Sequence, residues 1–169
     1  MSFNASRDQT QLQLVWAPLR AQAEHMLRIM QGWLRERPTE QEKVEVHVAS
    51  TWRDPAEQMV LFQRGRTRVN GAWFVENPKQ IVTKAPPEET AHCCLTADGK
   101  PASLAVDFVI LVDGKWAEDR DPRWALIPAA AALVNAEELE PGAFWNEPRD
   151  WPHVEVRHWR THAERRPKS

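Results

Sequence analysis

Two histidines and two aspartates give this chain a set of side chains suited to metal-assisted hydrolysis. His92, Asp107 and His153 offer two imidazoles and one carboxylate, a ligand set that suits a catalytic zinc ion with one coordination position left open. Asp150 lies shortly before His153 and adds a second carboxylate, where a general base for the attacking water would act. The sequence therefore predicts a zinc hydrolase, although imidazole and carboxylate ligands also suit other divalent ions.

Each of these residues has a simpler interpretation when it is taken alone. Asp107 lies inside the apolar run 104–111, where a carboxylate is costly to bury unless it is paired or bound to metal. For that run alone, an ion pair with an arginine or a solvent-facing strand is the more common explanation. A single histidine is usually an exposed residue or a satisfied core residue. The prediction of a metal site therefore depends on the whole set.

Cys93 and Cys94 permit a rival metal site, in which a thiolate beside His92 binds a structural zinc ion. Successive residues of an extended segment point to opposite sides, however, and the chain has no second cysteine pair to close such a site. Two adjacent cysteines cannot form a long-range disulfide within the chain. We therefore expect free thiols and synthesis in a reducing compartment.

The bulk properties of the chain exclude several classes of protein. A length of 169 residues fits one domain over 1–169, and a formal net charge of -2 does not favour nucleic-acid binding by the whole chain. The first residues, MSFNASRDQTQLQ, lack the apolar stretch of a signal peptide, and the apolar run 124–134 is too short to cross a bilayer. We expect a monomeric protein, cytoplasmic on synthesis, with no stable membrane insertion.

Hydrophobic periodicity predicts an α+β fold with a small antiparallel sheet and flanking helices. Apolar residues recur at helical spacing over 17–36, and valines alternate with polar residues over 44–48. We expect helices over 17–36, 54–65 and 121–135, and strands over 44–48, 81–83, 104–112 and 153–156. Residues 1–9 and 160–169 are polar and are expected to form flexible arms.

Several blocks of the sequence, in order from about 45 to 156, resemble the VanY-like zinc peptidases, which comprise D-Ala-D-Ala carboxypeptidases and L-alanyl-D-glutamate endopeptidases. The stretch ASTWRDPAEQMVLFQRGRT resembles the S-x-Y-R-[S/D]-x-x-x-Q … Q-G-R-T block of that family, and IVTKA resembles the segment before its first zinc histidine. Thr90-Ala91-His92, Ser103 to Phe108 and Asp150 to Glu155 stand where the family has S-x-H, G-x-A-x-D-F and D/E-x-P-H-F-E.

The resemblance implies a fold and a role for individual residues. The fold would be that of the DD-carboxypeptidase and Hedgehog-like zinc peptidases. The zinc ligands would be His92, Asp107 and His153, and the catalytic base would be Asp150. Arg53 would stabilise the developing oxyanion or a substrate carboxylate. Gln58 would shape the same wall of the cleft, and the resemblance also suggests that the cleft is lined by Trp145 and Trp151.

The chain departs from the family pattern between its first histidine and its aspartate. The family usually has a shorter spacing, whereas fourteen residues separate His92 from Asp107 here. Asp98-Gly99 is a turn signal, so we expect residues 93–103 to form an inserted loop or short hairpin at the cleft rim. Ser103 replaces the usual glycine, and the predicted base is an aspartate with a side chain one methylene shorter than glutamate.

The resemblance implies a peptidase that hydrolyses peptidoglycan stem peptides. The compact form without a signal peptide resembles phage endolysins of this family, which reach the cell wall after release through a holin and cut the L-Ala–D-Glu bond. D-Ala-D-Ala cleavage is the alternative within the family. A catalytically silent relative that binds cell wall, or a phage structural part, is an alternative from another class. Asp150 favours an enzyme, because a binding module needs no base beside the metal.

Overall fold

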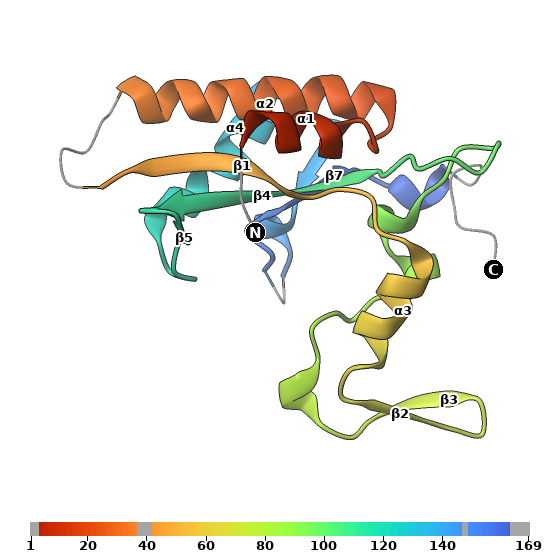
Figure 1. Cartoon of the computed structure of the whole chain (residues 1–169). Helices are drawn as coiled ribbons and strands as arrows, with labels where there is room; N and C mark the ends of the chain where they lie inside the picture. Colours follow the sequence, from red (N-terminus) through yellow and green to blue (C-terminus); the bar gives the residue numbers. More distant parts are fainter. Residues whose placement is uncertain (1–3, 37–41, 147–148, 163–169) are drawn as a thin grey trace.

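An antiparallel sheet of five strands forms the centre of the computed structural model, which describes residues 4–36, 42–146 and 149–162 (Figure 1). The strand order is β1-β4-β7-β6, and the short β5 pairs with one end of β4; every pairing is antiparallel. The strands are β1 (Val44–Ser50), β4 (Ala105–Val112), β5 (Lys115–Trp116), β6 (Leu139–Pro141) and β7 (His153–Val156). The predicted α+β class with a small antiparallel sheet is confirmed.

Helices α1 (Ala5–Leu12), α2 (Ala17–Glu36) and α4 (Leu126–Asn135) pack against the sheet, and the 3-10 turn Pro122–Ala125 precedes α4. Helix α3 (Pro55–Gln63) lies away from the sheet. Helix α2 has the predicted bounds, and the apolar stripe that predicted it is buried, comprising Leu19, Ala23, Met26, Leu27 and Met30. In Figure 1, α2 lies along one face of the sheet and α1 lies beside β1.

The two-residue period of the strands places successive side chains on opposite faces of the sheet. Side chains from β1, β4 and β7 join α2 and α4 in one hydrophobic core, among them Val46, Val48, Val106, Phe108, Ile110, Val154 and Val156. The alternate positions Asp107, His153 and Glu155 therefore point to the other face. On β4, Asp107 shares its face with Ala105 and Val109, which are also buried, so both faces of this strand are covered near the site.

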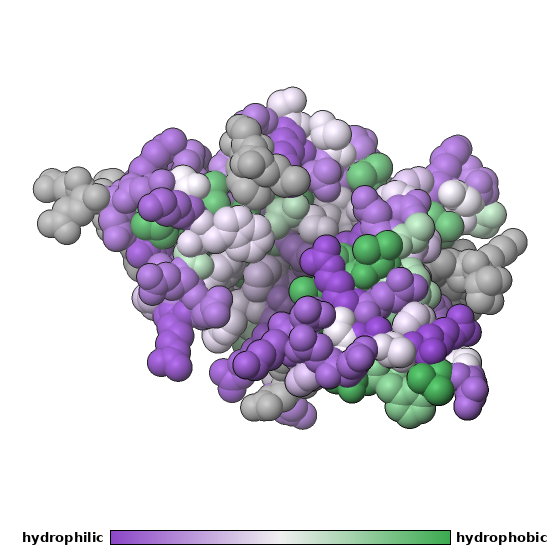
Figure 2. Space-filling view, turned by 60° about the horizontal axis from the view of Figure 1, so that its bottom comes forward, coloured by the Kyte–Doolittle hydropathy of each residue, from purple (hydrophilic) through white to green (hydrophobic). Residues whose placement is uncertain are grey.

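A second part of the structure extends away from the sheet on the side opposite α2 (Figure 1). It comprises α3 and a two-stranded hairpin of β2 (Arg66–Val69) and β3 (Ala72–Val75). Asp54 caps α3 by accepting from the Ala56 N–H, and Pro55 occupies the first turn, as the sequence predicts. Figure 2 views this side and shows a mostly hydrophilic surface with separate hydrophobic groups.

Three predictions of local structure are wrong in part. Residues 5–9, expected to lie in a flexible arm, begin helix α1, because Asn4 caps it and because Leu12 is buried against the body of the fold. Residues 81–83 are irregular rather than a strand; Arg66 donates to the Thr83 carbonyl, and Gln58 donates to the Thr83 hydroxyl and to the Ala85 carbonyl. Residues 160–161 belong to the 3-10 turn Trp159–Thr161.

The predicted arms lie in part outside the described ranges, at residues 1–3 and from 163 onward. Within the described ranges, the structure contains no helix whose length and apolar content would allow it to cross a membrane.

Candidate metal centre

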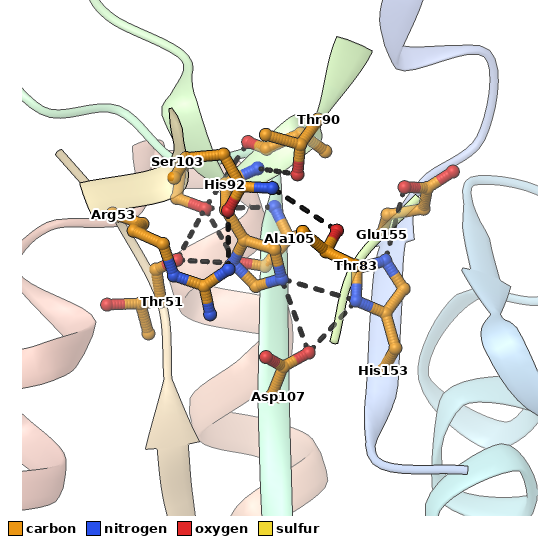
Figure 3. A network of polar contacts seen from close by, with 12 residues as sticks. Thr51, Arg53, Thr83, Thr90, His92, Ser103, Ala105, Asp107, His153 and Glu155 are labelled. Atoms are coloured by element: carbon orange, nitrogen blue, oxygen red, sulfur yellow. Dashed lines mark hydrogen bonds and ion pairs between the residues drawn. The ribbon is translucent and has the colours of Figure 1, made fainter. Parts of the chain in front are cut away.

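Strand pairing brings Asp107 and His153 together. They are direct cross-strand partners on β4 and β7, and both point to the same face of the sheet. His92 arrives from a different part of the chain, the 3-10 turn Ala91–Cys93, whose cap is the hydroxyl of Thr90 accepting from the His92 N–H. The Leu104 N–H binds the Ala91 carbonyl at 3.0 Å, which ties this turn to the start of β4. Figure 3 shows the three side chains converging.

The facing atoms of the three side chains have the spacing of a metal ligand set. His92 Nε2 lies 3.3 Å from His153 Nδ1 and 3.3 Å from Asp107 Oδ1, and His153 Nδ1 lies 2.9 Å from Asp107 Oδ1. A tetrahedral zinc ion with ligand bonds near 2.0–2.1 Å holds its ligand atoms roughly 3.3 Å apart. The group His92, Asp107 and His153 could therefore hold a metal ion with little rearrangement.

The outward nitrogen of each histidine is bound to an oxygen acceptor. His92 Nδ1–H donates to the backbone carbonyl of Thr51, and His153 Nε2–H donates to Glu155 Oε2 at 3.1 Å (Figure 3). Such contacts fix the tautomer of a metal-bound histidine and leave the inward nitrogen free to bind the ion. Both imidazoles are oriented in this way, and both residues are only 5% exposed.

The charges of the site are strongly coupled. Burial by itself raises the pKa of Asp107, but the charges and N–H groups of His92 and His153 outweigh it and hold that pKa well below its usual range. Burial by itself lowers the pKa of His153, but hydrogen bonds to Asp107 and Glu155 outweigh it and raise the pKa to about 10. Without a metal ion, a cation on His153 thus compensates the carboxylates.

Asp150 is placed beside the ligands by a tight turn. Its carbonyl accepts from the His153 N–H at 3.2 Å, and its own N–H donates to the Gly142 carbonyl at 3.1 Å. Its side chain lines the same cavity as the three ligands, and the partial loss of water there raises its pKa, as does the negative charge of Asp107. A raised pKa suits a carboxylate that must accept a proton near neutral pH.

Gly142 allows this turn to approach the rest of the fold. A Cβ atom at Gly142 would lie 2.6 Å from the Asp150 carbonyl oxygen and 3.2 Å from the Cβ atom of His153. Because one of these atoms is backbone, any side chain at this position would displace the turn that carries Asp150 and His153.

Arg53 lines the cavity and is held by two contacts. Its backbone N–H donates to the His92 carbonyl at 3.0 Å, and its Nη1 donates to Gln58 Oε1 at 2.6 Å. Gln58 is 1% exposed, and its amide nitrogen donates to the Ala85 carbonyl at 2.7 Å. Gln58 therefore links Arg53 to the irregular segment 81–85, which forms another wall of the cavity.

The cavity has a volume of about 710 Å³, which suits a small ligand or a short peptide segment. Its wall carries both signs of charge, with Arg53, Lys84 and Arg160 as cations and Glu89, Glu140, Asp150 and Glu155 as further acids. Of the two predicted tryptophans, Trp145 lines the cavity, and the centroid of its ring lies 5.0 Å from the centroid of the His153 ring. Trp151 is not part of the wall and packs against the hydrophobic core.

Residues 94–102 form a short hairpin, in which Leu95 and Pro101 form a bridge around the turn at Gly99. No residue of the predicted insertion 93–103 lines the cavity. Both cysteines are buried and lie outside the ligand group. Burial raises the pKa of the Cys93 thiol to about 12, which disfavours the thiolate that zinc requires.

Three further residues belong to the site but were not predicted from the sequence: Thr51, Gly142 and Glu155. Only Glu155 had a usable signal: it lies two residues after His153 on a predicted strand, so it must share the face of His153. The contacts of Thr51 and Gly142 are made by the backbone and depend on distant segments.

Comparisons with known proteins support the fold. No family model matches the chain, and no curated protein sequence matches it. Among solved structures, the chain is similar to the Serratia marcescens L-Ala D-Glu endopeptidase ChiX, with a TM-score of 0.55 and 17% sequence identity, over 94% of this chain and 92% of that one. At this level of identity the similarity shows a shared fold.

Proposed function

We propose that the protein is a zinc-dependent peptidase that hydrolyses peptidoglycan stem peptides at the L-Ala–D-Glu bond. The observation that carries the proposal is the arrangement of His92, Asp107 and His153, with their inward atoms 2.9–3.3 Å apart and both outward imidazole nitrogens bound to oxygen. The fold shared with an L-Ala D-Glu endopeptidase supports the choice of substrate.

The three ligands would hold the ion at the floor of the cavity. A bound zinc ion supplies Lewis acidity, which polarises a carbonyl and makes water acidic enough to lose a proton near neutral pH. The protein contributes the orientation of both imidazoles through Thr51 and Glu155, so that their inward nitrogens point to one place.

Asp150 is the base in this proposal. Its carboxylate accepts the proton of the attacking water and then returns it to the amine that leaves as the peptide bond breaks. Its raised pKa brings the carboxylate closer to the proton affinity that this transfer needs.

Arg53 is the second electrostatic group in the proposal. A guanidinium held by Gln58 on the cavity wall is oriented before substrate binds, so it can stabilise the developing oxyanion or a substrate carboxylate without reorganisation. The stem peptide carries the α-carboxylate of D-Glu next to the scissile bond, which gives this cation a partner.

The test compares purified peptidoglycan and two synthetic peptides, one with an L-Ala–D-Glu bond and one ending in D-Ala-D-Ala, as substrates of the zinc-loaded protein. We expect mass spectrometry to show cleavage after L-Ala, loss of cleavage with a chelator and recovery with zinc. Asp150→Asn should retain zinc and lose about 10²–10⁴-fold in rate.

Three results would contradict parts of this proposal. Release of D-Ala alone would change the bond. Equal activity of wild type and Asp150→Asn would remove the assigned base. Zinc and peptidoglycan binding by both proteins, with no cleavage of any substrate, would indicate a silent cell-wall-binding relative.

A further inference from the structure

Strand β1 contains a β-bulge immediately before the residues that reach the metal centre. Val48 pairs with Phe108 and Ser50 pairs with Asp107, so Ala49 is an extra residue on β1. A bulge bends its strand and redirects the residues that follow it. Here the following residues include Thr51, whose carbonyl accepts from His92 Nδ1 (Figure 3).

Helix α1 holds this bulge from the outer edge of the sheet. β1 is an edge strand, so the backbone groups of Val48 that point away from β4 need partners from outside the sheet. The Asp8 carboxylate accepts from the Val48 N–H at 2.9 Å, and the Arg7 guanidinium donates to the carbonyls of Val48 and Ala49. The two side chains thus bind the backbone groups of Val48 and the carbonyl of the extra residue, Ala49.

The same helix also binds Thr51 itself. The Thr51 hydroxyl donates to the Gln11 carbonyl at 2.9 Å, and Thr51 is fully buried. Asp8 is 1% exposed and also accepts from His47 Nδ1 at 2.9 Å. A carboxylate this deeply buried is costly unless its hydrogen bonds are made, so the position of α1 against β1 is specified closely.

We propose that α1 is the positioning element of the metal ligand His92, with Asp8 and Arg7 as positioning residues that act through the bulge and Thr51. The inference rests on the proposed metal site. When the bulge is released, the Thr51 carbonyl no longer defines the rotation and tautomer of the imidazole. Loss of such an outer contact typically weakens metal binding 10–100-fold.

The test measures zinc affinity by competition with a chromophoric chelator for wild type, Asp8→Ala and Asp8→Asn. We expect about 10–100-fold weaker binding by Asp8→Ala. Asp8→Asn should recover much of the affinity, because its amide oxygen still accepts from the Val48 N–H. Thr51→Val should also weaken binding, since it removes the bond to Gln11 and keeps the carbonyl; it provides the test if Asp8→Ala does not fold.

The control is Leu27→Ala, a truncation in α2 within the hydrophobic core and outside the cavity that holds the metal ligands. It should lower stability and leave the zinc affinity of the folded protein unchanged. With Co²⁺ in place of zinc, Asp8→Ala should alter the visible absorption spectrum, and Leu27→Ala should not.

Failure of this inference and failure of the proposed function give different results. If wild type binds zinc tightly and both Asp8→Ala and Thr51→Val bind it equally tightly, α1 does not position His92, and the metal site stands. An unchanged Co²⁺ absorption spectrum in Asp8→Ala also overturns the inference. If wild type itself binds no zinc, the proposed function fails.

Discussion

Zinc binding should displace a proton from His153. In the metal-free protein, Asp107 and Glu155 outweigh burial and raise the pKa of this imidazole to about 10. At pH 7 only about one molecule in a thousand then has the neutral imidazole that zinc requires. The apparent zinc affinity should therefore rise about tenfold, or about 1.4 kcal/mol, for each pH unit between 7 and 9.

The assay is competition with a chelator at each pH, corrected for the protonation of the chelator itself. Calorimetry in buffers of different ionisation enthalpy counts the released protons. Glu155→Gln is the matched variant, because it keeps an oxygen acceptor for His153 Nε2–H and removes one of the charges that raise the pKa. Its affinity should depend less steeply on pH. A wild-type affinity that is constant between pH 7 and 9 would refute the reasoning.

Three other predictions follow from the structure. The raised pKa of His153 stabilises the metal-free fold fully below about pH 6.5 and progressively less as the pH rises toward 10, so chemical denaturation should show a free energy of unfolding that falls over this range. The lowered pKa of Asp107 has the opposite dependence, because its stabilisation of the fold is present at neutral pH and is lost only in acid. Arg53→Ala should lower kcat about 10²–10³-fold with zinc content unchanged, and Gln58→Ala should lower kcat less, because it only frees the guanidinium. Equal kcat in the wild type and both variants would exclude Arg53 from the reaction. Gly142→Ala should cost about 1–3 kcal/mol of stability and reduce activity. Its control is Gly32→Ala, where a Cβ meets nothing within 4 Å and which should stabilise α2 by up to about 1 kcal/mol. Activity retained in Gly142→Ala would show that the turn at Asp150 tolerates displacement.

The elements that the sequence predicted well are those whose signal is local. The apolar stripe of α2 and the continuous run of β4 each determine one buried face, and the predicted bounds agree with the structure within a residue or two. Asn70-Gly71 is also a local signal for a hairpin turn, and both residues have positive φ in the β2–β3 turn, which was not among the predicted elements.

Helix α1 could not be recognised in the same way. It buries only Leu12 and Asp8, and an aspartate in a polar segment predicts an exposed position. Its burial makes sense only once β1 is known to be an edge strand with outward-pointing backbone groups, which is a property of the whole sheet.

The candidate site likewise combines features that the sequence predicts with features that depend on distant segments of the chain. The three predicted ligands came from their types and from a family resemblance, and the structure brings them together through the pairing of Asp107 with His153. The roles of Asp150, Arg53, Gln58 and Trp145 stay predictions. The place of the insertion 93–103 could not be foreseen, because it depends on backbone bonds of Ser103 to Leu14 and Trp16, far away in the chain.

Metal analysis of the purified protein tests the central claim most directly. The wild type, His92→Ala and His153→Ala are dialysed against equal zinc concentrations and measured by mass spectrometry of the element. One zinc ion per wild-type chain, and loss of that ion in both variants that remain folded, is the expected result. Equal zinc content in all three proteins, or none in the wild type, would contradict the account.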